Sequence, residues 1–318
     1  MKENPIIQAA GLDKKYSEVH AVKAVDFSIH EGEIFSLLGP NGAGKSTTIS
    51  MLTTLLKPTG GDAVIKGSSV TKNPMEVKKL LGVVPQDLAL YQDLNAVQNL
   101  RFWGKLYGLR GSDLGQRIER VLEMVGLSER QKQRVDKFSG GMKRRLNIAA
   151  ALLHDPEIII MDEPTVGIDP QSRRHILDNV KKLNQAGKTV LYTTHYMEEA
   201  QELSHNIAIM DHGNIVAYGT HEELVRRIGE QDRIVLTVSA QTQQHTHEIS
   251  EKWQSVTGVR AVTQNENEVI VLADDSNKVL PDLFEIATRE ESRITSVDIM
   301  EPNLEAVFLH LTGHSLRD

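Results

Sequence analysis

The nine residues GPNGAGKST, at positions 39–47, constrain this chain more than any other stretch. They follow the apolar run 34–38, which is typical of a buried strand, and they precede a helical pattern over residues 46–56. Three glycines in nine positions allow backbone conformations that other residues avoid. The stretch therefore predicts a tight turn that joins a buried strand to the first turn of a helix.

This turn matches the phosphate-binding pattern G-x-x-x-x-G-K-[ST] in the context that the pattern requires. Backbone N–H groups of a glycine-rich turn can point at phosphate oxygens, and the N-terminus of the following helix adds partial positive charge. We expect Lys45 to reach the β- and γ-phosphates of a nucleotide and the Ser46 hydroxyl to bind Mg²⁺. A chance match in a glycine-rich turn is the alternative. The predicted nucleotide-binding residues are Gly39, Pro40, Asn41, Gly42, Ala43, Gly44, Lys45, Ser46 and Thr47.

A pair of acidic residues follows a second apolar run. Residues 158–161 lead into Asp162 and Glu163, so one carboxylate ends a buried strand and the next lies just beyond it. Asp162 is suited to hold Mg²⁺, and Glu163 to orient or deprotonate an attacking water. Alone this pattern is a weak signal, but together with a phosphate-binding turn it indicates nucleotide hydrolysis.

Ser139, Gly140 and Gly141 open a long helical run between these two groups. One interpretation is an N-cap serine followed by a flexible turn. Two consecutive glycines are poor helix formers, at about 1 kcal/mol each relative to alanine, so a cap alone gains little from them. Glycines do allow a phosphate to approach bare backbone donors. We therefore favour a phosphate contact.

With these motifs, residues 5–228 resemble the ATP-binding subunit of an ATP-binding cassette (ABC) transporter. The resemblance implies ATP and Mg²⁺ as ligands and ATP hydrolysis as the activity. In that family the Ser-Gly-Gly element completes the ATP site of a second ATP-binding subunit, so hydrolysis requires a head-to-tail dimer. For this chain we expect a homodimer rather than a heterodimer.

Four further residues match motifs of the family. Tyr16 resembles the aromatic that stacks on adenine, with a solvent-facing ring at a strand end as the alternative. Gln86 resembles the glutamine that contacts Mg²⁺ and the attacking water. Asp169 resembles the aspartate that communicates across the dimer, although Asp169 before Pro170 is also a good N-cap. His195 resembles the switch histidine that contacts the γ-phosphate.

The resemblance thus gives each group a role. The expected catalytic residues are Glu163, His195, Gln86 and Lys45, and the expected metal ligands are Ser46, Gln86 and Asp162. Besides residues 39–47, the expected nucleotide contacts are Tyr16, Ser139, Gly140, Gly141 and Asp169. Phe138 and Met142 stand where the family's commonest signature, Leu-Ser-Gly-Gly-Gln, has leucine and glutamine. The contact that the family's glutamine makes is therefore not assigned to a residue of this chain.

The order of strand-like and helical runs predicts an α/β fold of the P-loop NTPase type, as in ABC ATPases. Strand-like runs at 22–29, 33–38, 80–85, 157–162, 188–193 and 206–210 favour a mostly parallel, helix-covered sheet. Amphipathic patterns over 96–107 and 116–125 predict a helical insertion, which as a subdomain spans about residues 87–155. The ATP-binding domain is expected to be residues 1–229.

A new order of strand-like and helical patterns begins near residue 230 and predicts a small α+β accessory domain over 230–318. We expect strands at 233–238 and 293–299, a hairpin over 259–273, and helices at 247–256, 281–288 and 303–311. This segment holds seven Lys and Arg against sixteen Asp and Glu, which disfavours nucleic acid or anionic lipid as a partner. Two histidine pairs could suggest a metal site, His245 with His247 and His310 with His314. Neither pair has further ligands at spacings typical of metal sites, so we expect solvated histidines.

The expected location is cytoplasmic, at the inner face of the cell membrane. The longest apolar runs hold about six residues, whereas a spanning helix needs about twenty. The chain has no cysteine and its first residues lack a signal-like segment. The resemblance to ABC transporters implies association with the membrane through a separate transmembrane permease.

The segment GMKRRL, the residues MEEA soon after His195, and the ending EPNLEAVFLHLTGHSLRD resemble ATPases of ABC-2 type exporters, including the daunorubicin-resistance type. We therefore expect a subunit that hydrolyses ATP and drives efflux of a drug, antibiotic, lipid or polysaccharide. Candidates for contact with the permease are Leu88, Leu90, Tyr91 and Leu94, with local core packing as the alternative for each.

Two other functions use the same phosphate-binding turn. A soluble mechanical ATPase of the ABC type, acting on nucleic acid or ribosomes, is the first alternative, but this chain has one cassette, no sustained heptads and an acidic tail. A P-loop kinase of small molecules is the second, and it gives no reason for the Ser-Gly-Gly element or for His195. The exporter subunit is the preferred hypothesis.

Overall fold

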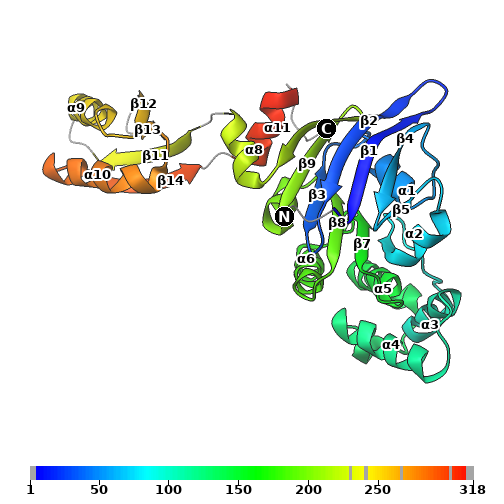
Figure 1. Ribbon diagram of the computed structural model, residues 1–318. Coiled ribbons are helices and arrows are strands. Elements are labelled where there is room, and N and C mark those ends of the chain that lie inside the picture. Colours follow the sequence, from blue (N-terminus) through cyan, green and yellow to red (C-terminus); the bar gives the residue numbers. More distant parts are fainter. Residues whose placement is uncertain (1–4, 229–230, 240–242, 266–267, 301–302, 313–318) are drawn as a thin grey trace. The chain divides into compact units, whose positions relative to one another are not determined.

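The computed structural model describes residues 5–228, 231–239, 243–265, 268–300 and 303–312 of the 318-residue chain. The chain divides into two compact units, one ending at His221 and the other beginning at Glu222. The first unit contains two sheets and the second contains one (Figure 1). Each unit has its own buried core.

A six-stranded sheet forms the centre of the first unit, in the order β10-β9-β3-β8-β7-β6. Neighbouring strands are parallel except for the β9-β10 hairpin. The carboxyl ends of β3, β7 and β8 therefore lie at one edge of the sheet, where α/β proteins place their ligands. The strands are β3 (Ile34–Leu38), β6 (Leu81–Val84), β7 (Ile158–Asp162), β8 (Thr189–Thr194), β9 (Asn206–Asp211) and β10 (Asn214–Gly219).

A second sheet of the first unit is antiparallel, in the order β2-β1-β4-β5. The strand predicted at 22–29 exists as β2, but it pairs with β1 and not with the parallel strands, so its predicted place was wrong. The sequence analysis also missed β1, β4, β5 and β10. The strands of this sheet are β1 (Ile7–Lys15), β2 (His20–Ile29), β4 (Gly60–Ile65) and β5 (Ser68–Ser69).

The two faces of the six-stranded sheet pack against different layers. In β7, Ile158 and Ile160 join the core of the antiparallel sheet and α1, whereas Ile159 and Met161 join the core of the α3–α6 region. Burial on both faces explains the continuous apolar run that predicted this strand. The helices around the two sheets are α1 (Lys45–Leu52), α2 (Pro74–Leu80), α6 (Pro170–Gln185) and α7 (Met197–Leu203).

A helical region separates β6 from β7, as predicted (Figure 1). Asn95 starts its first helix with a capping box, in which the Asn95 side chain accepts from the Gln98 backbone N–H and the Gln98 side chain accepts in return. The region comprises α3 (Ala96–Leu106), α4 (Gly111–Met124), the 3-10 turns Ser128–Arg130 and Val135–Lys137, and α5 (Gly140–Leu152). None of the helices in the described ranges has the length and apolar character of a membrane span.

The second unit is an antiparallel sheet, in the order β12-β13-β11-β14, with helices packed on it. Trp253 is fully buried in its core. The helix predicted from Pro281 begins five residues earlier, because Asp275 caps it and Pro281 lies inside it. The elements are α8 (His221–Ile228), β11 (Asp232–Ser239), α9 (Gln243–Gln254), β12 (Val259–Asn265), β13 (Glu268–Ala273), α10 (Ser276–Arg289), β14 (Arg293–Met300) and α11 (Leu304–Thr312).

Gly82 tests the packing between β6 and the end of α5. A Cβ at Gly82 would lie 2.6 Å from both the Ala151 carbonyl oxygen and the Pro156 Cγ atom. We predict that Gly82→Ala lowers the free energy of unfolding by about 2 kcal/mol, because overpacking costs roughly 1–3 kcal/mol. Urea denaturation of the full chain measures this value. In the control Gly115→Ala, within α4, the new Cβ meets nothing within 4 Å, so alanine should add about 0.5–1 kcal/mol. Equal stability of the two variants would contradict the prediction.

Candidate active site

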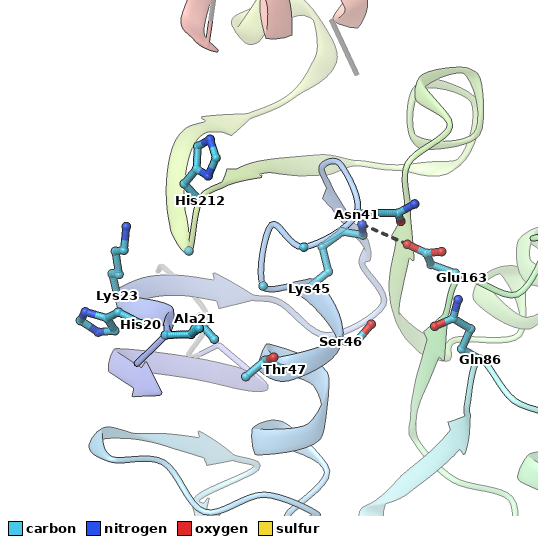
Figure 2. A pocket seen from close by; sticks show the side chains of 14 residues that line it. His20, Ala21, Lys23, Asn41, Lys45, Ser46, Thr47, Gln86, Glu163 and His212 are labelled. Carbon is cyan, nitrogen blue, oxygen red and sulfur yellow. Dashed lines mark ion pairs between the residues drawn. The ribbon is translucent and has the colours of Figure 1, made fainter. Parts of the chain in front are cut away.

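A hollow of about 400 Å³ lies where the turn after β3 meets the ends of β6 and β7. Eight of the predicted site residues line it: Asn41, Gly42, Gly44, Lys45, Ser46, Thr47, Gln86 and Glu163. The sequence analysis missed the other lining residues, Val19, His20, Ala21, Lys23, His212 and Gly213. In Figure 2 the Lys45 side chain extends toward Glu163, and Lys23 and His212 lie on the opposite side of Lys45 from Glu163.

Two glycines of the turn are required by close contacts with neighbouring strands. A Cβ at Gly39 would lie 2.2 Å from the Met210 carbonyl oxygen in β9, and a Cβ at Gly44 would lie 2.5 Å from the Ala21 carbonyl oxygen in β2. Gly44 is also the N-cap of α1 and has a φ of 107°, which favours glycine. The turn therefore packs closely against one strand of each sheet, β9 and β2. The first residues of α1 line the hollow.

The Lys45 ammonium is only 4% exposed and is surrounded by oxygen atoms. It donates to the carbonyl oxygens of Gly39, at 2.7 Å, and Pro40, at 3.0 Å. It also lies 3.0 Å from Oε1 of Glu163, as the dashed line in Figure 2 marks. A buried cation needs such partners. Because phosphate oxygens can replace these acceptors, Lys45 is placed to bind a phosphate at the turn.

Asp162 lies at the end of β7, beside the first turn of α1. Its Oδ1 accepts from the Ser46 hydroxyl at 3.2 Å and from the Thr193 hydroxyl at 2.6 Å. The carboxylate and the serine hydroxyl are hard oxygen donors next to the phosphate-binding turn. They fit Mg²⁺, which proteins hold through one or two such groups together with the phosphates of the substrate.

The Glu163 backbone is held in an unusual conformation. Its φ is 43°, in the left-handed region, and its N–H donates to the Thr193 hydroxyl at 2.9 Å. Its carboxylate lies between Lys45 and His195, with Oε2 3.4 Å from Nδ1 of His195. Strained backbone of this kind persists where the surroundings hold it, often at functional sites. The predicted base and the predicted switch histidine are therefore in contact distance.

The Ser-Gly-Gly element lies apart from the hollow, at the N-terminus of α5. The Ser139 side chain caps α5 by accepting from the Met142 N–H at 3.2 Å, and a Cβ at Gly141 would lie 2.0 Å from the Ser172 hydroxyl oxygen of α6. Asp169 caps α6 by accepting from the Ser172 N–H at 2.9 Å, and hydrogen bonds of this kind lower the pKa of Asp169. Both side chains therefore act as N-caps, the phosphate contact that we favour for the Ser-Gly-Gly element stays a prediction, and the two helix N-termini lie side by side.

Tyr16 also lies outside the lining of the hollow. It is 45% exposed in the turn between β1 and β2, and its N–H donates to the carbonyl of Val19, which does line the hollow. The Lys14 ammonium lies 5.3 Å from the centre of the ring. Of the four histidines expected to be solvated, His310 is exposed, while His314 and the side chains of His245 and His247 lie outside the described residues.

Arg144 is a residue of this site that the sequence analysis missed. Its buried guanidinium donates to the carbonyl oxygens of Pro85, at 2.8 Å, and Gln86, at 2.6 Å, and so ties α5 to the segment that carries Gln86. Burial lowers the pKa of Arg144. The sequence pattern does not distinguish the buried Arg144 from Lys143 and Arg145, which are more exposed. Thr193 was more predictable from the sequence, because the three residues before His195, at the end of a buried strand, all carry hydroxyl groups.

Comparison with known proteins places the chain in a family. The model of the family described as ABC transporter matches residues 22–166. The chain is 47% identical to the linearmycin resistance ATP-binding protein LnrL of Bacillus subtilis strain 168, over 98% of this chain and 100% of that protein. It is 36% identical to the daunorubicin/doxorubicin resistance ATP-binding protein DrrA of Streptomyces peucetius, over 98% of this chain and 94% of that protein.

A solved structure shares the architecture as well. A dimeric ATP-binding cassette in a post-hydrolysis state with ADP and Pi matches with a TM-score of 0.61 and 29% identity, over 67% of this chain and 98% of that one. The predicted fold class and the predicted resemblance are confirmed. The chain belongs to the ABC transporter family, as one of its ATP-binding, ATP-hydrolysing subunits.

Proposed function

We propose that this chain hydrolyses ATP to drive the efflux of a drug or antibiotic through a separate transmembrane permease. The observation that carries the proposal is the convergence of Lys45, Asp162 and Glu163 beside the phosphate-binding turn. The relatives named for resistance to linearmycin and to daunorubicin and doxorubicin support the choice of cargo. These relatives do not favour a mechanical ATPase acting on nucleic acid.

The proposal gives roles to the phosphate-binding turn and to the polar residues beside it. The N-terminus of α1 and Lys45 bind the β- and γ-phosphates of ATP. Ser46 and Asp162 hold Mg²⁺, with Gln86 on the same side of the hollow, and the ion supplies positive charge to the phosphate oxygens. Glu163 accepts the proton of the attacking water, and His195, 3.4 Å from Glu163, contacts the γ-phosphate.

A second copy of this chain completes the site in our proposal. Ser139 and Gly140 are exposed at the N-terminus of α5, outside the hollow of their own chain. A helix N-terminus with glycines suits a phosphate, and a twofold dimer would bring it to the hollow of the partner. Asp169, beside this N-terminus, then lies at the contact between the copies, and Tyr16 stacks on the adenine at the rim.

The surface that contacts the permease follows Gln86 in the helical region. Tyr91 is 48% exposed and its ring lies edge-on to Phe102, with centroids 4.8 Å apart. Leu88 is exposed as well, whereas Leu90 packs against the buried core and Leu94 is half-buried. We therefore assign the contact to Leu88, Tyr91 and Phe102. This contact holds the chain at the inner face of the membrane, with residues 230–318 as an accessory domain.

Glu163→Gln tests the proposed base. The amide keeps the shape of the side chain but cannot take a proton, so we predict that hydrolysis falls about a hundredfold or more. ATP binding should persist and a dimer should accumulate with ATP and Mg²⁺. Phosphate release and size-exclusion chromatography measure the two effects. The control is Glu157→Gln, half-exposed just before β7, which should hydrolyse ATP at the wild-type rate. Full hydrolysis by Glu163→Gln would refute this role.

Tyr91→Glu tests the contact with the permease. A charge at an aromatic contact should weaken binding of the permease about thirtyfold, because such anchors are worth about 2 kcal/mol or more. We predict that efflux is lost from cells that express both proteins, while the purified chain keeps its basal ATP hydrolysis. Met75→Glu, on α2 and 65% exposed, should leave efflux unchanged. Normal efflux with Tyr91→Glu would exclude this surface.

A further inference from the structure

Glu199, on α7, is a buried carboxylate that lies outside the hollow and is only 2% exposed. Its Oε2 accepts hydrogen bonds from the hydroxyls of Thr165, at 3.0 Å, Tyr192, at 2.9 Å, and Thr194, at 2.9 Å. Its Oε1 lies 3.5 Å from Nε of Arg173 on α6. Burial of a carboxylate is costly unless donors surround it, and here three hydroxyls and one cation do so.

The hydroxyl donors come from the two segments that carry the proposed catalytic groups. Thr165 lies two residues after Glu163, in the segment that leads to α6. Thr194 directly precedes His195, and its hydroxyl accepts from the Tyr196 N–H at 2.9 Å while it donates to Glu199. One carboxylate oxygen therefore joins the segment after β7 to the turn after β8.

Two neighbouring side chains strengthen this connection. The Arg173 guanidinium lies 4.2 Å from the ring centre of Tyr196, so Arg173 contacts both Glu199 and the His195 turn. Burial, together with the charge of Glu199, raises the pKa of Tyr192 well above its usual value. The Tyr192 hydroxyl therefore remains a donor to Glu199 near neutral pH.

We infer that Glu199 is a positioning residue for ATP hydrolysis: it fixes Glu163 and His195 relative to each other without touching the phosphate-binding turn. The inference rests on the proposed function. Loss of its charge would loosen both segments at once, because Thr165 and Thr194 share one acceptor. An amide cannot replace the carboxylate, because its NH₂ group would face either the Arg173 donor or the three hydroxyls.

Glu199→Gln in the full chain, assayed with ATP and Mg²⁺, tests the inference. We expect kcat to fall about tenfold, since misplacement of a catalytic group by about 1 Å can cost about a hundredfold. KM for ATP and the affinity for a non-hydrolysable ATP analogue should stay near the wild-type values, because the partners of the Glu199 carboxylate, Thr165, Tyr192, Thr194 and Arg173, all lie outside the turn at 39–47. Thr165→Val, which removes one hydroxyl donor and keeps the carboxylate, should lower kcat to a smaller extent with the same unchanged affinity.

The matched control is Glu202→Gln, three residues further along α7. The Glu202 carboxylate also binds α6, through Arg174 at 2.6 Å and Lys181 at 2.7 Å, but at the surface and away from both segments. Its kcat should equal that of the wild type.

Two results would overturn the inference. One is a kcat of Glu199→Gln and of Thr165→Val equal to that of Glu202→Gln. The other is a parallel loss of kcat, analogue affinity and stability, which would indicate a general role in folding. Failure of the proposed function is distinguishable, because it appears as full hydrolysis by Glu163→Gln or as no hydrolysis by the wild type, whatever the residue at position 199.

Discussion

Parallel pairing of β3, β8 and β7 brings three strand ends to one edge of the central sheet, and most of the proposed catalytic groups lie at or just after those ends. The turn after β3 provides Lys45, the end of β7 provides Asp162 and Glu163, and the end of β8 leads into His195. The turn after β3 is held in place by close packing, because Gly39 approaches β9 and Gly44 approaches β2. The register between strands therefore sets the distances between the groups that the chemistry needs.

Buried charges at this edge are each matched by local partners. Lys45 has two carbonyls and Glu163 as partners, Asp162 has two hydroxyls, and Glu199 accepts from three hydroxyls and lies beside the Arg173 cation. Inside a protein such groups interact strongly, and an unpaired one is costly. The same matching orients the groups, because every partner is itself anchored in a strand or a helix.

Motifs that lie within a short stretch of sequence were predictable, whereas the residues that these motifs contact in the folded chain were not. The turn at 39–47, the acidic pair after β7 and most parallel strands have patterns that a short window contains. In contrast, β1 alternates buried and more exposed residues weakly, and β4 begins with two glycines, so their antiparallel pairing depends on contacts distant in sequence. Arg144 and Glu199 lie next to other charged residues on helices, and only the packing around them shows that they are buried.

The caps of α5 and α6 have one more consequence. The Ser139 oxygen and the Asp169 carboxylate accept from N–H groups of their own helices, so the Ser139 hydroxyl proton and the first peptide N–H groups of α5 are the donors left for an outside anion. Main-chain recognition does not depend on the neighbouring side chains. Phe138 and Met142 flank these main-chain donors, so in our proposal the side chains at these two positions can change without removing the donors.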